Sequence, residues 1–254
     1  MRNTKTIKGE SGVRELFMAL IKQTTPNGFE HLVYDFIPTS HVDSFGNHFV
    51  IVGDGPHHHL FTCHLDTYPL EDDEGFMRSC MINVIDEGNI IRTDGTSILG
   101  ADDKAGMTVM LTMIEAGIPG IYGFFLAEEI GLYGSKHAAK EKDIHAFLND
   151  VKAVISFDRK ETSSIITHQR NTRTCSEGYA LQLQSAFADA GIILDLDPKG
   201  TATDSWSFFS YDSTLECTNI SVGYWDQHTH CEYQDIAYLV QLCKAVITMQ
   251  WPVP

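Results

Sequence analysis

Apolar and polar positions follow two periods along this chain, and together they predict interleaved strands and helices. Short apolar runs of strand length lie at 48–52, 60–63, 121–127, 153–157 and 217–222. Apolar residues recur at helical spacing over 12–23, 29–36, 105–116, 134–142, 177–190 and 235–249. Such alternation is typical of a sheet with helices on both faces. We therefore expect an α/β fold with a central, mostly parallel mixed β-sheet.

The chain is expected to form one domain. Its 254 residues are many for a single hydrophobic core but within reach of one α/β domain. The sequence contains no internal repeat, low-complexity tract or linker-like segment. No boundary between two folding units is therefore predicted.

The strand that begins at Leu60 ends in side chains that can bind a metal ion. His64 and Asp66 are two residues apart, so both point to the same side of an extended chain. A carboxylate beside a histidine can fix the imidazole tautomer and leave the other ring nitrogen free for a metal. Taken alone, this pair fits a buried His–Asp hydrogen bond equally well.

Further acidic and histidine clusters follow at other strand ends and in loops. They are Asp102 and Asp103, Glu128 and Glu129, Asp158, and His228 and His230. Each cluster has a structural alternative, such as a helix N-cap for Asp102. Glu128 and Glu129, however, directly follow an apolar run, where two carboxylates are costly unless positive charge compensates them. We expect these clusters to meet at the carboxyl ends of the strands, where open α/β sheets bind ligands.

The set of side chains fits a hydrolase that uses two divalent metal ions. Two ions about 3.5–4 Å apart need a bridging carboxylate and further His, Asp or Glu ligands on each side. A separate carboxylate must accept the proton of the attacking water and pass it to the leaving amine. Zinc is the first choice for such mixed His and carboxylate ligands, and cobalt or manganese would fit the same set.

The order of these motifs resembles that of the co-catalytic zinc exopeptidases of the M20, M28 and M42 type. The matching pieces are His-x-Asp, Gly-Ala-Asp-Asp-Lys-Ala-Gly, Glu-Glu, Asp and His. The stretch from Thr93 to Gly106 is similar to peptidase T, and Glu128–Ser135 resembles the M28 aminopeptidases. The resemblance spans Leu60 to Tyr233.

The resemblance implies a role for each matching residue. The implied metal ligands are His64 and Asp158 on one ion, Glu129 and His228 on the other, and Asp102 bridging both. Glu128 would act as general base and acid, and Asp66 would orient His64. Asp103 stays open as an alternative to Asp102, and His230 as an alternative to His228.

Spacing within the motif set favours a bare catalytic domain. M20 enzymes insert a dimerisation domain between the metal-binding Asp and the last His, but the stretch from Asp158 to His228 is already used by strands and a helix. M42 enzymes insert a small β domain between the first His and the bridging Asp, and the stretch from His64 to Asp102 is too short for one. We expect residues 1–254 to be a single metallopeptidase catalytic domain, without an inserted dimerisation or lid domain, and a monomer.

Net charge and cysteine content limit the classes of binding partner and the expected cellular compartment. A formal net charge of −16 argues against nucleic acid and anionic membranes as partners. The opening residues lack the apolar core of a signal peptide. The six cysteines include no C-x-x-C pair, and most lie in apolar surroundings that favour a buried, reduced thiol. A cytoplasmic location is therefore expected.

The expected function is a metal-dependent exopeptidase, with an aminopeptidase acting on small peptides as the first choice. A carboxypeptidase, a dipeptidase or an N-acyl amino-acid deacylase acting on acyl amino acids would use the same metals. Arg159, Arg170 and Arg173 lie near the expected crevice, where they either receive a substrate carboxylate or neutralise an acidic surface. A non-catalytic metal- or peptide-binding module is disfavoured, because no ligand position and neither catalytic carboxylate is substituted. The segment 206–209 is expected to pack in the core.

Overall fold

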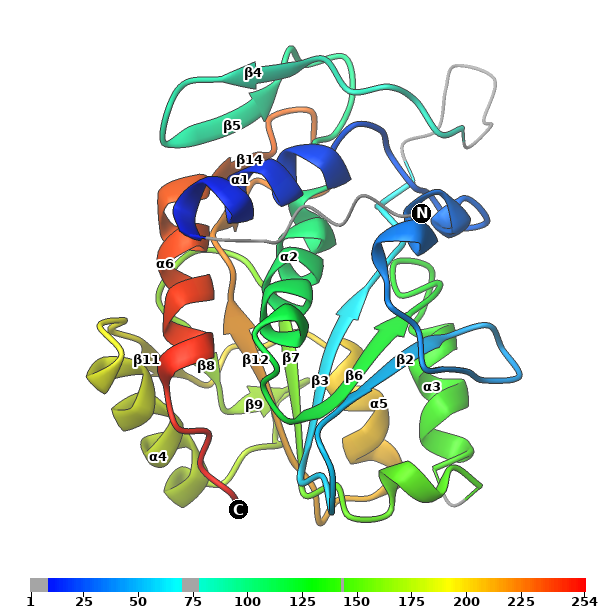
Figure 1. Ribbon diagram of the computed structural model, residues 1–254, viewed down its shortest axis with the longest axis vertical. Coiled ribbons are helices and arrows are strands. Elements are labelled where there is room, and N and C mark those ends of the chain that lie inside the picture. Colours follow the sequence, from blue (N-terminus) through cyan, green and yellow to red (C-terminus); the bar gives the residue numbers. More distant parts are fainter. Residues whose placement is uncertain (1–8, 70–77, 143) are drawn as a thin grey trace.

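The computed structural model describes residues 9–69, 78–142 and 144–254. Its main sheet has eight strands in the order β1-β2-β6-β3-β7-β12-β8-β11 (Figure 1). In chain order the strands are β1 (His41–Val42), β2 (His48–Val52), β3 (His59–His64), β6 (Gly120–Phe125), β7 (Ala153–Arg159), β8 (Ser164–Ile166), β11 (Asp195–Asp197) and β12 (Glu216–Ser221). The four central strands β6, β3, β7 and β12 run parallel. β2 pairs antiparallel with β6, and β8 pairs antiparallel with β12.

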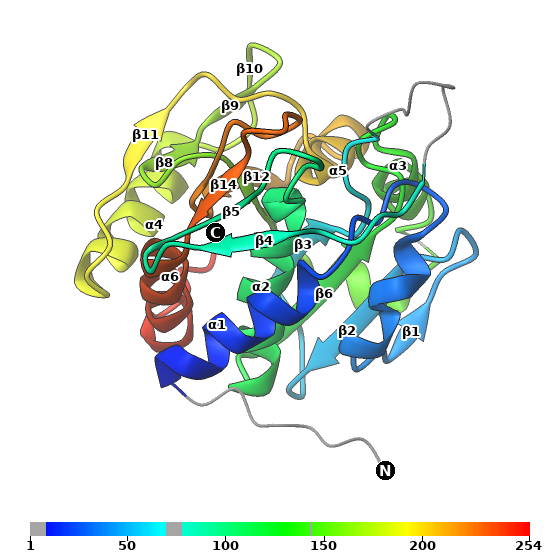
Figure 2. The ribbon, with the colours of Figure 1, turned by 90° about the horizontal axis from the view of Figure 1, so that it is seen from above.

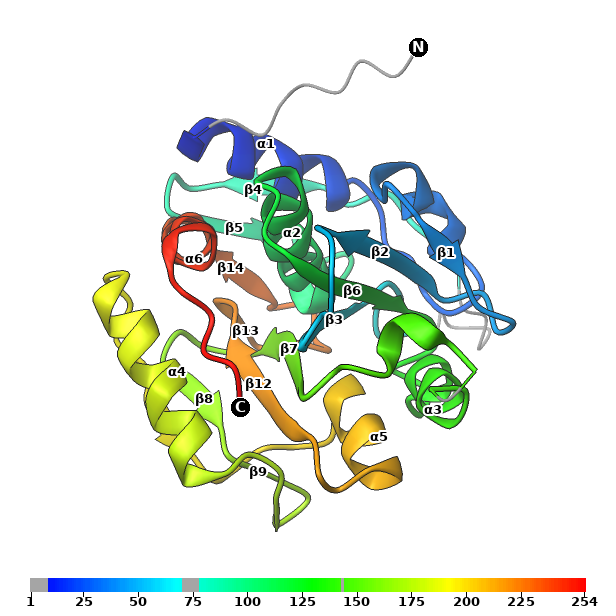
Figure 3. The ribbon, with the colours of Figure 1, turned by 60° about the horizontal axis from the view of Figure 1, so that its bottom comes forward.

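Helices cover both faces of the main sheet (Figure 3). One face packs against α1 (Gly9–Leu20), α2 (Ala101–Glu115), α4 (Glu177–Asp189) and α6 (Ile236–Thr248), and the other against α3 (Tyr133–Lys140) and α5 (Asp204–Tyr211). Because side chains alternate along a strand, the neighbours Leu60 and Phe61 of β3 enter opposite cores. The predicted single-domain α/β fold with a large mixed sheet is confirmed. In the described part of the chain, no helix has the length and apolar character needed to cross a membrane.

A second, four-stranded sheet lies at the end of the molecule toward which β3 and β6 run (Figure 1). Its order is β13-β14-β5-β4, and the strands are β4 (Val84–Asp86), β5 (Ile90–Thr93), β13 (Tyr224–Trp225) and β14 (Tyr233–Asp235). Figure 2 shows β5 beside β14, the pairing that joins the stretch before Asp102 to the stretch after His228. Between β3 and α2, the described residues form only the β4–β5 hairpin and its connections. Among the residues that the structure describes, this stretch contains no inserted dimerisation or lid domain.

The short helices agree with the sequence-based expectation only in part. The helix expected over 29–36 is found as the 3₁₀ helix η1 (Glu30–Phe36). Pro38 explains why the helix ends at Phe36, because a proline disfavours helical dihedrals in the residue before it, and Ile37 is extended (φ −92°, ψ 118°). The helix α5 was not predicted, and neither was the 3₁₀ helix η2 (Ala146–Leu148).

Candidate metal centre

The centre lies where three neighbouring parallel strands end side by side. β3 lies between β6 and β7 in the main sheet. His64 is the last residue of β3, Asp158 is the last but one of β7, and Glu128 and Glu129 follow β6 after a short turn. Because these strands are parallel, their carboxyl ends share one edge of the sheet. The structure thus brings together the residues that the sequence placed at strand ends.

Asp102 lies between two histidines. Its Oδ1 is 3.0 Å from Nε2 of His64, and its Oδ2 is 3.2 Å from Nε2 of His228. The same His64 nitrogen is 3.6 Å from Oδ1 of Asp158, and the same His228 nitrogen is 3.0 Å from Oε1 of Glu129. The five side chains therefore form two half-sites, one with His64 and Asp158 and one with His228 and Glu129, joined by the Asp102 carboxylate.

Asp103 and Asp102 have different environments, although a cis peptide bond joins them. The Asp103 carboxylate accepts hydrogen bonds from the backbone N–H groups of His64 (3.2 Å) and Gly106 (3.0 Å). Candidate ligand atoms within 4.8 Å of one another form two groups in the described residues. These are His64, Asp102 and Glu129, and His64, Asp103 and Asp158. Asp103 therefore backs one half-site and ties β3 to α2, whereas Asp102 contacts both histidines.

His228 and His230 also lie in different places. The imidazole of His228 stacks on Tyr68 with ring centroids 4.2 Å apart and an interplanar angle of 13°. This stacking fixes the ring so that Nε2 faces Asp102 and Glu129. His230 is exposed. The geometry therefore favours His228 as the histidine of the second half-site.

Asp66 orients its neighbours in a way that differs from the sequence-based expectation. His64 Nδ1 donates to the backbone carbonyl of Asp66 at 2.8 Å, while the Asp66 carboxylate lies 3.5 Å from that nitrogen. The carboxylate instead accepts hydrogen bonds from the backbone N–H groups of Glu128 (3.0 Å) and Glu129 (3.1 Å). The physical reason is that the turn after β6 points two N–H groups at a buried carboxylate. With Nδ1 as the donor, Nε2 of His64 keeps its lone pair for a metal.

The loop that presents Asp102 is held by Glu232, whose side chain is buried. Its two oxygens accept hydrogen bonds from the backbone N–H groups of Gly100 (2.7 Å) and Asp102 (3.0 Å). Burial raises the pKa of Glu232 to about 7. Gly100 has φ +66°, and a Cβ there would lie 2.7 Å from Cγ2 of Thr67. No role was predicted for Glu232, and its only signal in the sequence is the spacing His228-Thr229-x-x-Glu232.

Three residues that the sequence motifs did not link to Asp158 hold it in place. Tyr224 donates its hydroxyl to Oδ1 at 2.9 Å, and Thr203 donates its hydroxyl to Oδ2. The Asn219 amide accepts from the backbone N–H of Asp158 (2.9 Å) and donates to its carbonyl (2.8 Å). These partners come from separate elements, so no local sequence pattern reveals them.

The centre holds more buried carboxylates than cationic groups. Burial raises the pKa of Glu128, and it raises the pKa of Glu129, next to the Asp102 charge, to about 7. Burial also opposes the charge on His228, but its contacts with Asp102 and Glu129 prevail and raise its pKa to about 10. Within the described residues, Oε1 of Glu129 is buried and makes no hydrogen bond, although Nε2 of His228 lies 3.0 Å away. A donor set with this excess of buried carboxylates fits divalent cations.

The three arginines named from the sequence lie in different surroundings. Arg159 forms an ion pair with Asp197 of β11 at 3.1 Å. Arg170 and Arg173 are exposed on a hairpin formed by β9 (His168–Gln169) and β10 (Thr172–Arg173), and the Arg170 guanidinium lies over the Trp206 ring. Trp206 and Phe209 are half-buried and Phe208 is buried, so the expected core packing of 206–209 is only partly found.

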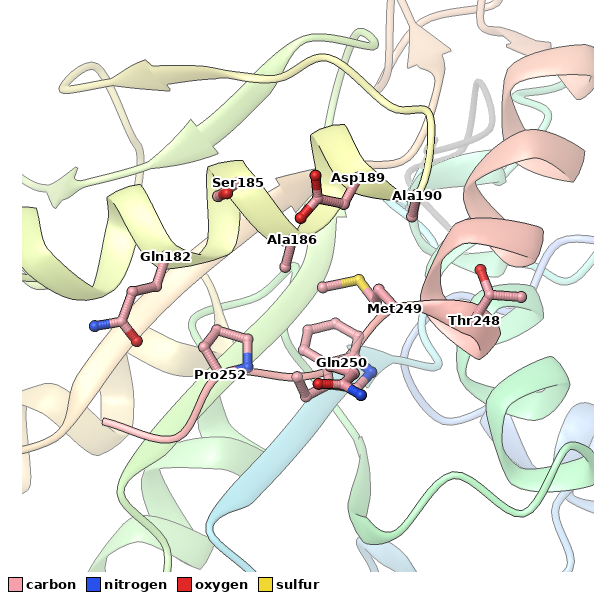
Figure 4. Close-up of a pocket in the computed structure, with 10 residues that line it drawn as sticks. Gln182, Ser185, Ala186, Asp189, Ala190, Thr248, Met249, Gln250 and Pro252 are labelled. Atoms are coloured by element: carbon pink, nitrogen blue, oxygen red, sulfur yellow. The ribbon is translucent and has the colours of Figure 1, made fainter.

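A cavity of about 650 Å³ lies away from the metal centre (Figure 4). It is formed by α4 and the carboxyl-terminal segment, with Gln182, Asp189, Met249 and Trp251 among its lining residues. His59, at the opposite end of β3 from His64, donates to the carbonyl of Pro252 in this segment. No residue of the two half-sites lines the cavity, so it is separate from the centre.

Comparison with known protein families shows to which family the chain belongs. The model of peptidase family M28 matches residues 47–241, which includes every residue of the two half-sites. The chain belongs to peptidase family M28. The resemblance to the co-catalytic zinc exopeptidases is thereby confirmed.

Individual relatives and structural neighbours of the chain are named as peptidases or peptidase-like proteins. The M28 chain is 31% identical to a peptidase T-like protein of Rhizobium meliloti over 144 residues, 54% of this chain and 33% of the relative. It therefore spans about a third of the length of that protein. Its fold matches aminopeptidase PepT from Bacillus cereus with a TM-score of 0.74 and 16% identity, over 95% of this chain and 98% of PepT. It also matches a TET1 peptidase of Pyrococcus horikoshii with a TM-score of 0.64 and 18% identity, over 92% and 98% of the two chains.

Proposed function

We propose that this M28 chain is a metal-dependent exopeptidase that removes amino-terminal residues from small peptides. The observation that carries the proposal is the position of Asp102, whose two oxygens face the histidines of two half-sites. Membership of peptidase family M28 supports a peptidase, and the peptidase T-like and PepT relatives favour an aminopeptidase among the exopeptidases.

The five half-site residues are the proposed metal ligands. His64 and Asp158 would hold one divalent ion, His228 and Glu129 the other, and Asp102 would bridge them. Zinc is the first choice for this mixture of imidazole and carboxylate, and cobalt or manganese fits the same donors. Two such metal ions, when bound, lower the pKa of the attacking water and polarise the scissile carbonyl.

Glu128 is the proposed general base and acid. Burial and the neighbouring Asp158 charge hold its pKa above the ordinary range, which favours uptake of a proton from the attacking water. The same carboxyl group would then give that proton to the departing amine. Asp66 holds the Glu128 backbone through a hydrogen bond, so the carboxyl group is positioned before substrate arrives.

Three further features belong to the proposal. Residues 1–254 form one catalytic domain. The free state of all six cysteines agrees with the cytoplasmic location expected from the sequence, which cell fractionation would test. The expected monomer receives no support from the structural neighbours, because the TET1 peptidase is described as able to assemble into a tetrahedron or a large octahedral shell. Light scattering on the purified chain would measure its oligomeric state.

A paired hydrolysis assay tests the proposed function. The chain is incubated with a tripeptide that has a free amino terminus and with its acetylated form, each with and without a chelator. Cleavage of the free peptide alone, from its amino end and only without chelator, is the expected result. Cleavage of the acetylated peptide would replace the aminopeptidase by a carboxypeptidase or deacylase. The Glu128→Gln variant serves as the control for a contaminating peptidase.

A further inference from the structure

The hairpin β9–β10 carries an exposed arginine and is firmly attached to the residues that hold the metal centre. The amide of Gln169, which is fully buried, donates to the Ser205 hydroxyl at 3.0 Å and accepts from the backbone N–H of Thr203 at 3.3 Å. Arg170 itself donates its backbone N–H to the carbonyl of Gly200 at 3.2 Å. The base of the hairpin is therefore fixed against the start of α5, and Figures 2 and 3 place β9 and α5 on the same side of the main sheet.

The turn of the hairpin sets the place of Arg170. Thr172 pairs with Gln169, so the loop has two residues, Arg170 and Asn171, with φ +49° and +62°. Two residues with positive φ are typical of the tight turns whose twist matches the paired strands. The backbone position of the arginine is thus fixed by the turn and by the buried Gln169.

The Arg170 guanidinium lies over an aromatic ring of α5, the helix whose start contacts the centre. Its Cζ is 5.8 Å from the centroid of the Trp206 ring. Trp206 is the third residue of α5, and Thr203, at the N-cap position of this helix, donates its hydroxyl to Asp158. Thr203 and Trp206 are three residues apart, so they lie within one helical turn of about 5.4 Å along α5. Asp158, Thr203, Trp206 and Arg170 therefore form a chain of neighbouring residues that links the guanidinium to the centre.

Arg170 carries a positive charge in a protein that is acidic overall. The protein carries a formal net charge of −16, and the neighbouring centre is rich in carboxylates. In the described part of the chain, no ion pair is found for the Arg170 guanidinium, whereas Arg159 is paired with Asp197. Stacking on an aromatic ring holds a guanidinium in place and leaves its N–H edge free for a bidentate contact with a carboxylate.

We propose that Arg170, supported by Trp206, binds a carboxylate of the substrate and so determines which peptides are cleaved efficiently. The inference rests on the proposed exopeptidase function and adds a specificity residue to it. A carboxylate can come from the terminus of a short peptide or from an acidic side chain. Both present the same planar group to the guanidinium.

The experiment compares two substrate pairs that differ only by a carboxylate. The first pair is Ala-Ala-Ala and its carboxyl-terminal amide, and the second is Glu-Ala-amide and Gln-Ala-amide. We expect the wild-type chain to favour the charged member of one pair about tenfold in kcat/KM, mainly through KM, since a charged hydrogen-bonded contact of this kind contributes on that order. The pair that shows the preference identifies the source of the carboxylate.

Substitutions then assign the preference to Arg170. Arg170→Gln should bring the ratio within each pair close to one, and Trp206→Leu should reduce it in the same direction. Arg173→Gln, on the same hairpin, is the matched control and should keep the wild-type ratio. Ratios that stay unchanged in Arg170→Gln would overturn the inference while leaving the exopeptidase intact. If no peptide is hydrolysed, calorimetric binding of the same pairs decides: loss of the preference in Arg170→Gln supports the inference, and an unchanged preference refutes it.

Discussion

Replacing Asp66 by asparagine should damage both the stability and the activity of the protein. The buried Asp66 carboxylate accepts the backbone N–H groups of Glu128 and Glu129 at 3.0 and 3.1 Å. Asparagine keeps one acceptor oxygen, but its amide nitrogen would face the second N–H group, donor against donor. One hydrogen bond to a charged group is lost and a buried N–H is left unpaired.

The expected loss of stability follows from the hydrogen bonds of these two N–H groups. A hydrogen bond to a charged partner contributes about 1.5–3 kcal/mol, and an unpaired buried donor costs about 1–3 kcal/mol. Both values describe the loss of one contact and are therefore not fully additive. We expect the free energy of unfolding to fall by about 2–4 kcal/mol. A displacement of about 1 Å in the Glu128 carboxyl group can lower the rate about 100-fold, and we expect a loss of that order in kcat/KM.

Two variants separate these effects in urea denaturation and peptidase assays. Glu128→Gln should lose activity with little change in the free energy of unfolding, because the backbone contacts of Asp66 remain. Ser176→Ala removes the N-cap of α4, whose hydroxyl accepts from Tyr179, and should cost about 1 kcal/mol while activity is kept. An Asp66→Asn protein with wild-type stability and turnover would refute the proposed role of this carboxylate.

Further predictions concern the base, the second histidine and pH. Glu128→Gln should retain its metal by elemental analysis but lose turnover about 10²–10⁴-fold; undiminished turnover would exclude it as the base. His228→Gln should lower the bound metal per chain, whereas His230→Gln should not, and equal losses would contradict the geometry. In the metal-free protein, burial raises the pKa values of Asp204 and Glu232 to about 7, so the folded state holds protons that the unfolded chain has released. The free energy of unfolding should therefore fall as pH rises from about 5 to 7, and a rise in urea titrations of the chelated protein would contradict this.

The main features of the site could be predicted because they depend on strand order alone. His64, Glu128, Glu129 and Asp158 each follow an apolar run, and parallel strands bring such positions to one edge. The choice of Asp102 over Asp103 and of His228 over His230 came from the family resemblance and not from the residues themselves. That choice depends on side-chain packing, as with the stacking of His228 on Tyr68.

The missed features depend on contacts between distant segments. Tyr224, Thr203 and Asn219 hold Asp158 from three separate elements, and none of them is part of a motif. The helix α5 has only eight residues, too few for a clear helical period, and only its segment 206–209 was interpreted, as core packing. The role of Asp66 was predicted only in part, because a sequence shows that a carboxylate is present but not which N–H groups surround it.

A crystal structure of the zinc-loaded chain, with anomalous diffraction data at the zinc edge, would show directly whether two ions bind at the centre. We expect two peaks about 3.5–4 Å apart, on either side of the Asp102 carboxylate. One peak should lie beside His64 and Asp158, and the other beside His228 and Glu129. A single peak, or peaks bound by Asp103 or His230 in place of Asp102 or His228, would contradict the proposed two-ion centre.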